Sequence, residues 1–379
     1  MPLVVIVALL HAYIGWRILA ALGDSPVAFA LLASMLLASA LLMPLGLLAR
    51  RISRQPLADV LAWAGLLCMG LFSSLLVLTV LRDAVLLVAA IAAAALPSLA
   101  ALPALATWTA WAVPVVAAVV TVWGLVNARR TAAIVSVEVP IANLPPALHG
   151  FTIAQISDIH VGTTIKRGYV QAIVEAVNGL GADMVAVTGD LVDGTVSQLA
   201  EHVAPLAQLA SRHGTFFVTG NHEYYSGAQA WITELRRLGL RVLINEHVVL
   251  QHGAAPLLVA GVADFGAHHF EASHRSDPRA AMAGAPPGRV VSVLLAHQPR
   301  SAAAAAQAGF HLQLSGHTHG GQFWPWNWLV RLQQPFTAGL HRLQDLWVYT
   351  SRGTGYWGPP KRFGAPSEIT RLTLVAAGI

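Results

Sequence analysis

Gly316-His317-Thr318-His319-Gly320-Gly321 is the most specific stretch of this 379-residue sequence, and it follows the candidate strand 311–315 directly. The stretch places two imidazoles at strand spacing within a glycine-rich turn, so both side chains can point to the same face. Imidazole is a common metal ligand. A strand that ends in such a turn predicts an α/β domain with a metal site at its strand ends.

Four more polar clusters repeat this design of an apolar strand followed by metal-ligand residue types. Alone, each would more often be a plain turn or a histidine with a structural partner. Five independent strand ends that all present such residues would be a large coincidence, so we interpret the set as a site for two divalent metal ions. Its mixed nitrogen and oxygen ligands favour Mn, Fe or Zn over Mg. The four clusters are Asp158-Ile159-His160, Gly189-Asp190 with Asp193, Gly220-Asn221-His222-Glu223, and His297.

The second part of the chain alternates predicted strands and helices, which is typical of an α/β domain. We expect a linker over residues 131–149 and the domain over 150–379. Helices are expected at 167–180, 197–211, 227–238 and 299–308. Strands are expected at 152–157, 183–188, 215–219, 257–262, 290–296, 311–315, 346–350 and 368–375.

The order of these motifs over residues 150–375 resembles the signature of the calcineurin-like metallophosphoesterase superfamily. The resemblance implies a four-layer α/β/β/α sandwich and metal-dependent hydrolysis of a phosphoester. It also implies that His222 protonates or stabilises the leaving oxygen and that Asp193 orients the His222 side chain. For the metals, it implies one ion held by Asp158, His160, Asp190 and His319, and a second held by Asp190, Asn221, His297 and His317.

Finer features are similar to the membrane-associated bacterial branch of that superfamily, which includes YaeI and YkuE. These features are Gly316–Gln322, the stretch Ser351-Arg352-Gly353-Thr354-Gly355-Tyr356, and Gly364–Thr370. The resemblance implies a phospholipid, a lipid A precursor or another cell-envelope phosphoester as substrate. Gly194 stands where many phosphoprotein phosphatases of the superfamily carry arginine, which argues against that activity.

The first third of the chain is strongly apolar and predicts a membrane region over residues 1–130. Mean hydropathy is +0.61 and only 11% of residues are charged. Apolar segments near 3–22, 27–49 and 57–81 are each long enough to cross a bilayer. Arg82 and Asp83 follow the third of these segments. The long apolar stretch Ala84–Asn127 then provides one or two further membrane spans. The predicted count is therefore four or five, with Pro97 and Pro103 as places to break.

The basic residues give two answers for orientation in the bacterial cytoplasmic membrane. Arg50, Arg51 and Arg54 predict a cytoplasmic loop by the positive-inside rule. Five spans would then put the catalytic domain on the periplasmic face, and the length of Ala84–Asn127 favours this alternative. Four spans would instead keep Arg129 and Arg130 in the cytoplasm with the domain.

Other features limit the partners. The net charge is +5, but no basic helix or lysine-rich tract indicates nucleic-acid binding. The single Cys68 excludes a disulfide within the chain. The sequence leaves the oligomeric state open.

His11 and Arg17 lie in the first span, and we expect Arg17 to snorkel to the interface. A transporter or scaffold with a regulatory metal domain is the alternative function, but it would need more ionisable residues within the spans.

Aromatic residues gather after the last metal motif and again near residue 356. Two interpretations stay open, namely a membrane interface or acyl-chain groove, and an aromatic lid over the sheet ends. The residues are Phe323, Trp324, Trp326, Trp328, Tyr356 and Trp357, with Lys361 and Arg362 beside the last two.

Overall fold

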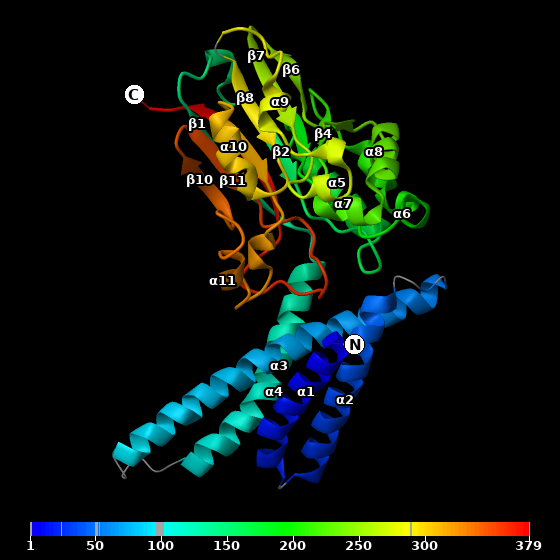
Figure 1. Cartoon of the computed structure of the whole chain (residues 1–379), viewed down its shortest axis with the longest axis vertical. Coiled ribbons are helices and arrows are strands. Elements are labelled where there is room, and N and C mark those ends of the chain that lie inside the picture. The colour runs from blue at the N-terminus through cyan, green and yellow to red at the C-terminus, as the bar shows by residue number, and fades with distance from the viewer. Residues whose placement is uncertain are drawn as a thin grey trace. The chain divides into compact units, whose positions relative to one another are not determined.

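The computed structural model describes residues 2–23, 25–49, 52, 54–95, 102–288 and 290–378 (Figure 1). It divides the chain into two compact units. The helical unit comprises Met1–Val126 with Gly358–Lys361, and the α/β unit comprises Asn127–Trp357 with Arg362–Ile379.

Four helices of the described residues are long and apolar enough to cross a membrane. They are α1 Pro2–Leu19, α2 Pro26–Leu48, α3 Gln55–Ala95 and α4 Leu102–Arg129. This is the lower of the two counts expected from the sequence. The apolar residues 84–95 lengthen α3 and form no fifth helix; at about 1.5 Å per residue α3 is roughly 60 Å long. Pro103 lies in the first turn of α4, whereas Arg50, Arg51 and Pro97 lie outside the described residues.

Arg82 and Asp83 lie inside α3, although the sequence placed them between two spans. Asp83 accepts hydrogen bonds from Tyr13 at 2.7 Å and from Arg17 Nε at 2.8 Å, while Arg82 donates to Thr109 of α4 at 3.1 Å. Arg17 was expected to snorkel, but it forms an ion pair because a carboxylate is in reach. The polar groups thereby join three apolar helices.

The α/β unit contains two six-stranded sheets (Figure 1). The first sheet has the order β1-β12-β2-β3-β4-β5 and the second has the order β10-β11-β9-β8-β7-β6. In the first sheet the strands are β1 Ala133–Ile141, β2 Thr152–Ile156, β3 Met184–Val187, β4 Thr215–Phe217, β5 Arg241–Val242 and β12 Glu368–Ala376. In the second they are β6 Glu246–His252, β7 Ala255–Gly261, β8 Val291–Leu295, β9 Leu312–Ser315, β10 Gly339–Leu343 and β11 Leu346–Thr350.

Alternate residues of each strand face two different cores, which produces four layers. In β3, Met184 and Ala186 face the core between the sheets, whereas Val185 and Val187 face helices. The predicted α/β/β/α sandwich is therefore confirmed. Against the first sheet lie α5 Arg167–Asn178, α6 Val196–Val203 and α8 Ala228–Arg237, and against the second lie α9 Pro278–Met282 and α10 Ala302–Gln307.

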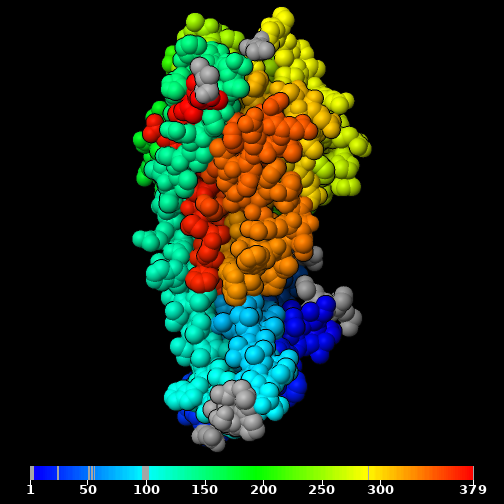
Figure 2. Space-filling view, turned by 90° about the vertical axis from the view of Figure 1, so that its left-hand side faces the viewer, coloured from blue at the N-terminus to red at the C-terminus, as the bar shows by residue number. Residues whose placement is uncertain are grey.

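The expected linker over 131–149 was wrong, because this segment contains strand β1. β1 pairs in parallel with β12 over nine residue pairs, from Ala133 opposite Glu368 to Ile141 opposite Ala376. Figure 2 shows the C-terminal strand in red beside β1 in green-cyan. The first strand of the α/β unit thus begins four residues after Arg129, the last residue of α4. Strands β5, β6 and β10 were also not predicted.

Candidate metal centre

Each of the five polar motifs follows the end of a strand. These strands are β2, β3 and β4 of the first sheet and β8 and β9 of the second, so the site takes residues from both sheets. Contacts link the predicted site residues into one cluster, in which three groups of side chains are close enough to hold a metal ion. The groups are Asp158 with His160 and His319, Asp190 with His297 and His317, and His160 with Asp193 and His222.

The first group contains three of the four residues that the resemblance implies for one ion, and the fourth, Asp190, lies near it. His160 Nε2 lies 3.0 Å from His319 Nε2, and His319 Nε2 lies 3.6 Å from Asp158 Oδ1. Asp190 Oδ2 is 3.9 Å from His160 Nε2. All four side chains are buried. Two imidazole nitrogens and two carboxylates therefore point into one small space.

The second group contains Asp190 again. Its Oδ2 lies 3.2 Å from His297 Nε2, which in turn lies 3.1 Å from His317 Nδ1. Asn221 Oδ1 is buried without a hydrogen-bond partner. Its sequence neighbours Gly220 and His222 both contact Asp190 through their backbones. Buried polar atoms nearly always have a partner, so this orphaned oxygen fits a metal ligand. The donor set fits two divalent ions that share Asp190.

The backbone of the site is unusual, because five of the predicted ligands have left-handed φ angles. Positive φ is uncommon for residues other than glycine and is concentrated at functional sites. Glycines allow the loops to approach one another: a Cβ on Gly220 would overlap the Asp190 carboxylate, and a Cβ on Gly316 would overlap Asp158. The five ligands are Asp158 (φ 54°), His160 (φ 57°), Asp190 (φ 51°), His317 (φ 70°) and His319 (φ 51°).

Glu223 ties two of these loops together, a role that the sequence did not reveal. Its carboxylate accepts hydrogen bonds from the backbone amides of Asp190 at 3.0 Å, Leu191 at 2.7 Å and Gly220 at 2.6 Å. The side chain is fully buried. Glu223 therefore fixes the Asp190 loop against the turn that carries Asn221.

The imidazole rings of His297 and His319 are oriented by contacts on the side away from the other ligands. His297 Nδ1 donates to the carbonyl oxygen of Thr188 at 2.7 Å, which leaves Nε2 facing Asp190. His319 Nδ1 instead faces a donor, since the buried Arg362 guanidinium lies 3.0 Å away. Burial and this guanidinium hold the pKa of His319 well below its usual range. His319 is therefore kept unprotonated, as a metal ligand must be.

In the second group, Asp190 and His317 have the protonation states of metal ligands, whereas Asp190 raises the pKa of His297 well above its usual range against the effect of burial. Burial would raise the pKa of Asp190, but the neighbouring His297 holds it well below the usual range. Burial and the proximity of His297 lower the pKa of His317 to about 3. At neutral pH the shared carboxylate is ionised and the His317 lone pair is free of a proton.

Asp193 contacts two histidines. Its Oδ1 lies 2.5 Å from His222 Nδ1 and 3.2 Å from His160 Nδ1. Burial alone would lower the pKa of His222, but the hydrogen bond to Asp193 and the charge of Asp190 raise it to about 9. His222 Nε2 lies 3.9 Å from Asp190 Oδ2 and faces the ligand cluster. The sequence predicted the contact with His222 but not the one with His160.

The aromatic residues near the site divide into two sets. Trp324, Trp326, Trp328 and Trp357 are exposed, and the Trp357 ring lies edge-on to His222 with 5.7 Å between centroids. Tyr356 is buried, as are the basic Lys361 and Arg362 that follow it, so of the two open interpretations the membrane interface does not fit these three residues.

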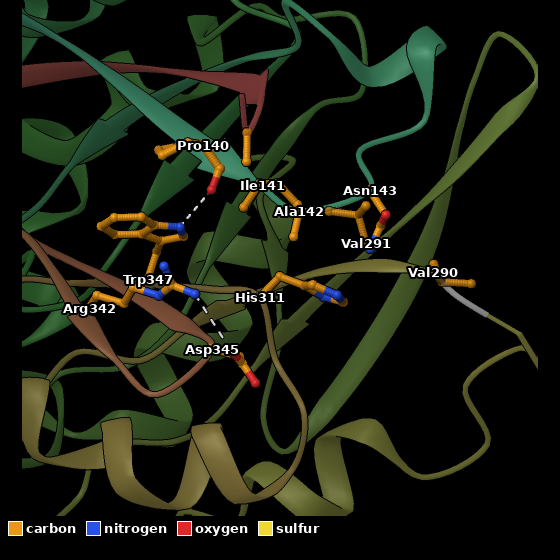
Figure 3. Close-up of a pocket in the computed structure, with 11 residues that line it drawn as sticks. Pro140, Ile141, Ala142, Asn143, Val290, Val291, His311, Arg342, Asp345 and Trp347 are labelled. Carbon is orange, nitrogen blue, oxygen red and sulfur yellow. Dashed lines mark hydrogen bonds and ion pairs between the residues drawn. The ribbon is translucent and has the colours of Figure 1, made fainter. Parts of the chain in front are cut away.

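A separate pocket of about 340 Å³ lies at the opposite ends of the second-sheet strands (Figure 3). Val291 at the start of β8 and His311 just before β9 line it, whereas the metal motifs follow the ends of these strands. Trp347 donates to Pro140 O at 2.6 Å, and Arg342 pairs with Asp345 at 3.6 Å. None of the predicted metal ligands lines this pocket.

Comparison with known proteins places these features in context. The family model for the calcineurin-like phosphoesterase matches residues 151–321. A transmembrane protein with metallophosphoesterase domain from Bos taurus is 43% identical over 274 residues, covering 69% of this chain and 61% of the relative. An uncharacterized metallophosphoesterase from Aquifex aeolicus is 32% identical over 228 residues, covering 60% of this chain and 85% of the relative.

The uncharacterized metallophosphoesterase YkuE from Bacillus subtilis is 28% identical over 243 residues, covering 61% of this chain and 81% of the relative. The chain thus matches most of the length of the two bacterial relatives. It spans less than two thirds of the length of the Bos taurus protein.

Proposed function

Because this chain belongs to the calcineurin-like metallophosphoesterase family, we propose that it is a membrane-anchored, binuclear metal-dependent phosphoric ester hydrolase. The observation that carries the proposal is the Asp190 carboxylate, whose Oδ2 lies near histidines of both ligand groups, 3.9 Å from His160 Nε2 and 3.2 Å from His297 Nε2. Nitrogen and oxygen donors together favour Mn, Fe or Zn.

The metal ligands, His222 and Asp193 have different roles in the proposed hydrolysis. Two divalent ions held by the two groups would neutralise phosphoryl charge and lower the pKa of a water molecule. His222 is the proton donor: its Nε2 faces the ligand cluster, and its pKa of about 9 keeps it protonated at neutral pH. When water adds to phosphorus and the P–O bond breaks, the leaving oxygen takes the Nε2 proton. Asp193 holds the other ring nitrogen.

The substrate we propose is a lipid-linked or cell-envelope phosphodiester, phosphomonoester or pyrophosphate. Four apolar helices and the similarity to a transmembrane protein with metallophosphoesterase domain support a substrate from the membrane. A nucleic-acid substrate is not supported by the charge distribution of the sequence.

For the location we propose the cytoplasmic face of a bacterial cytoplasmic membrane. The periplasmic expectation depended on five spans, and the described residues contain four suitable helices. Arg54 precedes α3, while Arg129 and Arg130 follow two crossings later. An even number of crossings separates these basic residues, so they share one side, and the positive-inside rule makes that side cytoplasmic.

One observation favours the alternative of a transporter with a regulatory metal domain. Asp83, Arg17 and Arg82 form a polar cluster among the apolar helices, and such residues often mark transport pathways. These charges pair with one another and join α1 to α3, which is a sufficient structural reason for them. The hydrolase therefore stays the favoured function.

The test is the substitution Asp190→Asn in the purified full-length protein with Mn present. Loss of the shared charge should lower turnover of a soluble aryl phosphodiester by about 100-fold or more and reduce the bound metal. Asp345→Asn is the matched control, because this aspartate is fully exposed and lies at the separate pocket. Near-normal turnover with two metals bound to Asp190→Asn would reject the assignment.

A further inference from the structure

Large apolar side chains are exposed in the segment that follows the last metal motif, Phe323–Leu332, which we term the tryptophan loop. The loop contains the short helix α11 Asn327–Val330. Scattered apolar residues are normal on a protein surface, but a contiguous run of this size marks an interaction site. The exposed side chains are Trp324 (42%), Trp326 (37%), Trp328 (60%), Leu329 (51%) and Leu332 (82%).

The composition of the tryptophan loop is that of a membrane interface. Tryptophan is enriched where apolar lipid tails meet polar headgroups, because the indole has an apolar body and a polar N–H. Arg331 lies over the Trp328 ring, with 5.4 Å between its guanidinium carbon and the ring centroid. A cation held beside exposed indoles suits the phosphates of anionic lipids.

The connection between α4 and the first strand of the α/β unit is short. α4 ends at Arg129 and β1 begins at Ala133. Even a fully extended connection of this length spans no more than about 14 Å. The connection is therefore too short to separate the first strand widely from the end of α4.

A second connection leads from the tryptophan loop to the membrane helices. Gln322, which precedes the loop, exchanges two hydrogen bonds with the backbone of Trp357, at 2.9 and 2.8 Å. The next residues, Gly358–Lys361, belong to the helical unit. There Lys361 Nζ donates to Gly70 O of α3 at 3.0 Å and to Ser74 Oγ. On the other side, Trp324 N donates to Phe363 O at 2.9 Å.

From these observations we propose that the tryptophan loop inserts into the interfacial layer of the bilayer that holds the chain's own helices. The loop continues directly from the His319 motif, and Trp357 lies edge-on to His222. Lipid headgroups at that layer are therefore presented to the metal centre. The substrate class is a phosphoester carried by a membrane lipid, and this second part rests on the proposed hydrolase function.

Docking is tested first, independently of activity. The full chain carries Cys68→Ser with Leu332→Cys, labelled with a thiol-reactive bimane, in nanodiscs that contain nitroxide-labelled lipids. Gln251→Cys is the matched control, since Gln251 is exposed on the β6 strand away from the loop. Strong quenching at position 332 and little at 251 supports docking. Equal quenching at both positions would overturn it.

The substrate part is tested with Trp324→Ala/Trp326→Ala/Trp328→Ala and with the milder Leu332→Asp. Nanodiscs of phosphatidylethanolamine and phosphatidylglycerol are compared with soluble bis(p-nitrophenyl) phosphate. We expect hydrolysis of lipid to fall about tenfold, as for a loss of about 1.4 kcal/mol, while the soluble reaction changes less than twofold. Val249→Ala, an exposed apolar residue of β6, is the control.

The possible failures can be distinguished. Equal losses on lipid and soluble substrates, or hydrolysis of the soluble substrate alone by the unmodified protein, would overturn the lipid-substrate part. A protein that is inactive on both substrates and yet quenched at position 332 would reject the proposed hydrolase function and support docking.

Discussion

Asp193 contacts both the proposed proton donor and one of the predicted metal ligands. One carboxylate oxygen contacts His222, the proposed proton donor, and also His160, a predicted metal ligand. A hydrogen bond to the remote ring nitrogen of a ligand histidine fixes its orientation and increases its basicity. Proton donation and the first metal group are therefore linked through one side chain.

This linkage gives a pH prediction. His222 is active as a donor when protonated, so hydrolysis of esters with poor leaving groups should decrease as pH rises through about 9. Asp193→Asn removes the charge that raises the pKa of His222, so this alkaline decrease should move to lower pH. The measurement is a pH–rate profile of kcat for phenyl and 4-nitrophenyl esters.

Two controls make the pH experiment specific. His222→Ala should keep both metals, lose about 10²-fold or more on the phenyl ester, and lack the alkaline decrease. Metal analysis of Asp193→Asn reports any effect through His160. An unchanged alkaline limb in Asp193→Asn would contradict the role given to Asp193.

Some residues of the site could be predicted from the sequence and others could not. Asp158, His160 and His317 follow strands in an ordered signature, so position and residue type together indicate them. Glu223 was visible in the motif, but its three backbone contacts depend on how two distant loops meet. The burial of the Arg362 guanidinium behind His319 was not predicted, because nothing in the local sequence indicates it.

At the scale of elements, the long strands and helices were predictable because their apolar periodicity is strong. β5 has two residues and β10 is half-exposed, so neither leaves a clear apolar signal. α3 was divided at Arg82 because charged residues within a span are costly in lipid. Their partner Arg17 is 66 positions away from Asp83 in the sequence, which hydropathy cannot reveal.

The ion pair in the helical unit leads to a stability prediction. Arg17→Gln and Asp83→Asn should each destabilise the packing of α1 on α3, and their double-mutant cycle should show a coupling of about 1 kcal/mol. The measurement is unfolding of the protein in detergent. The surface pair Arg237 and Glu234 is the matched control, and its coupling should be smaller because solvent screens an exposed ion pair. Zero coupling between Arg17 and Asp83 would contradict the structural role.

At the scale of the whole molecule, four crossings lead to a prediction of sidedness. A green fluorescent reporter fused after β12 should fluoresce, and an alkaline phosphatase reporter at the same place should be inactive, because the domain is proposed to be cytoplasmic. Fusions after Ala95, at the end of α3, are the control and should give the opposite pair of results. An active phosphatase after β12 would restore the periplasmic alternative.

The pairing of β1 with β12 has a consequence for biosynthesis. β1 leaves the ribosome directly after the last membrane helix, but its partner strand ends the domain and is made last. Chains emerge at about 5–20 residues per second, so β1 waits for at least about 10 seconds as an unpaired edge beside the translocon. An unpaired edge is a template for wrong pairing. The nascent domain should therefore depend on chaperone protection until its final strand is released.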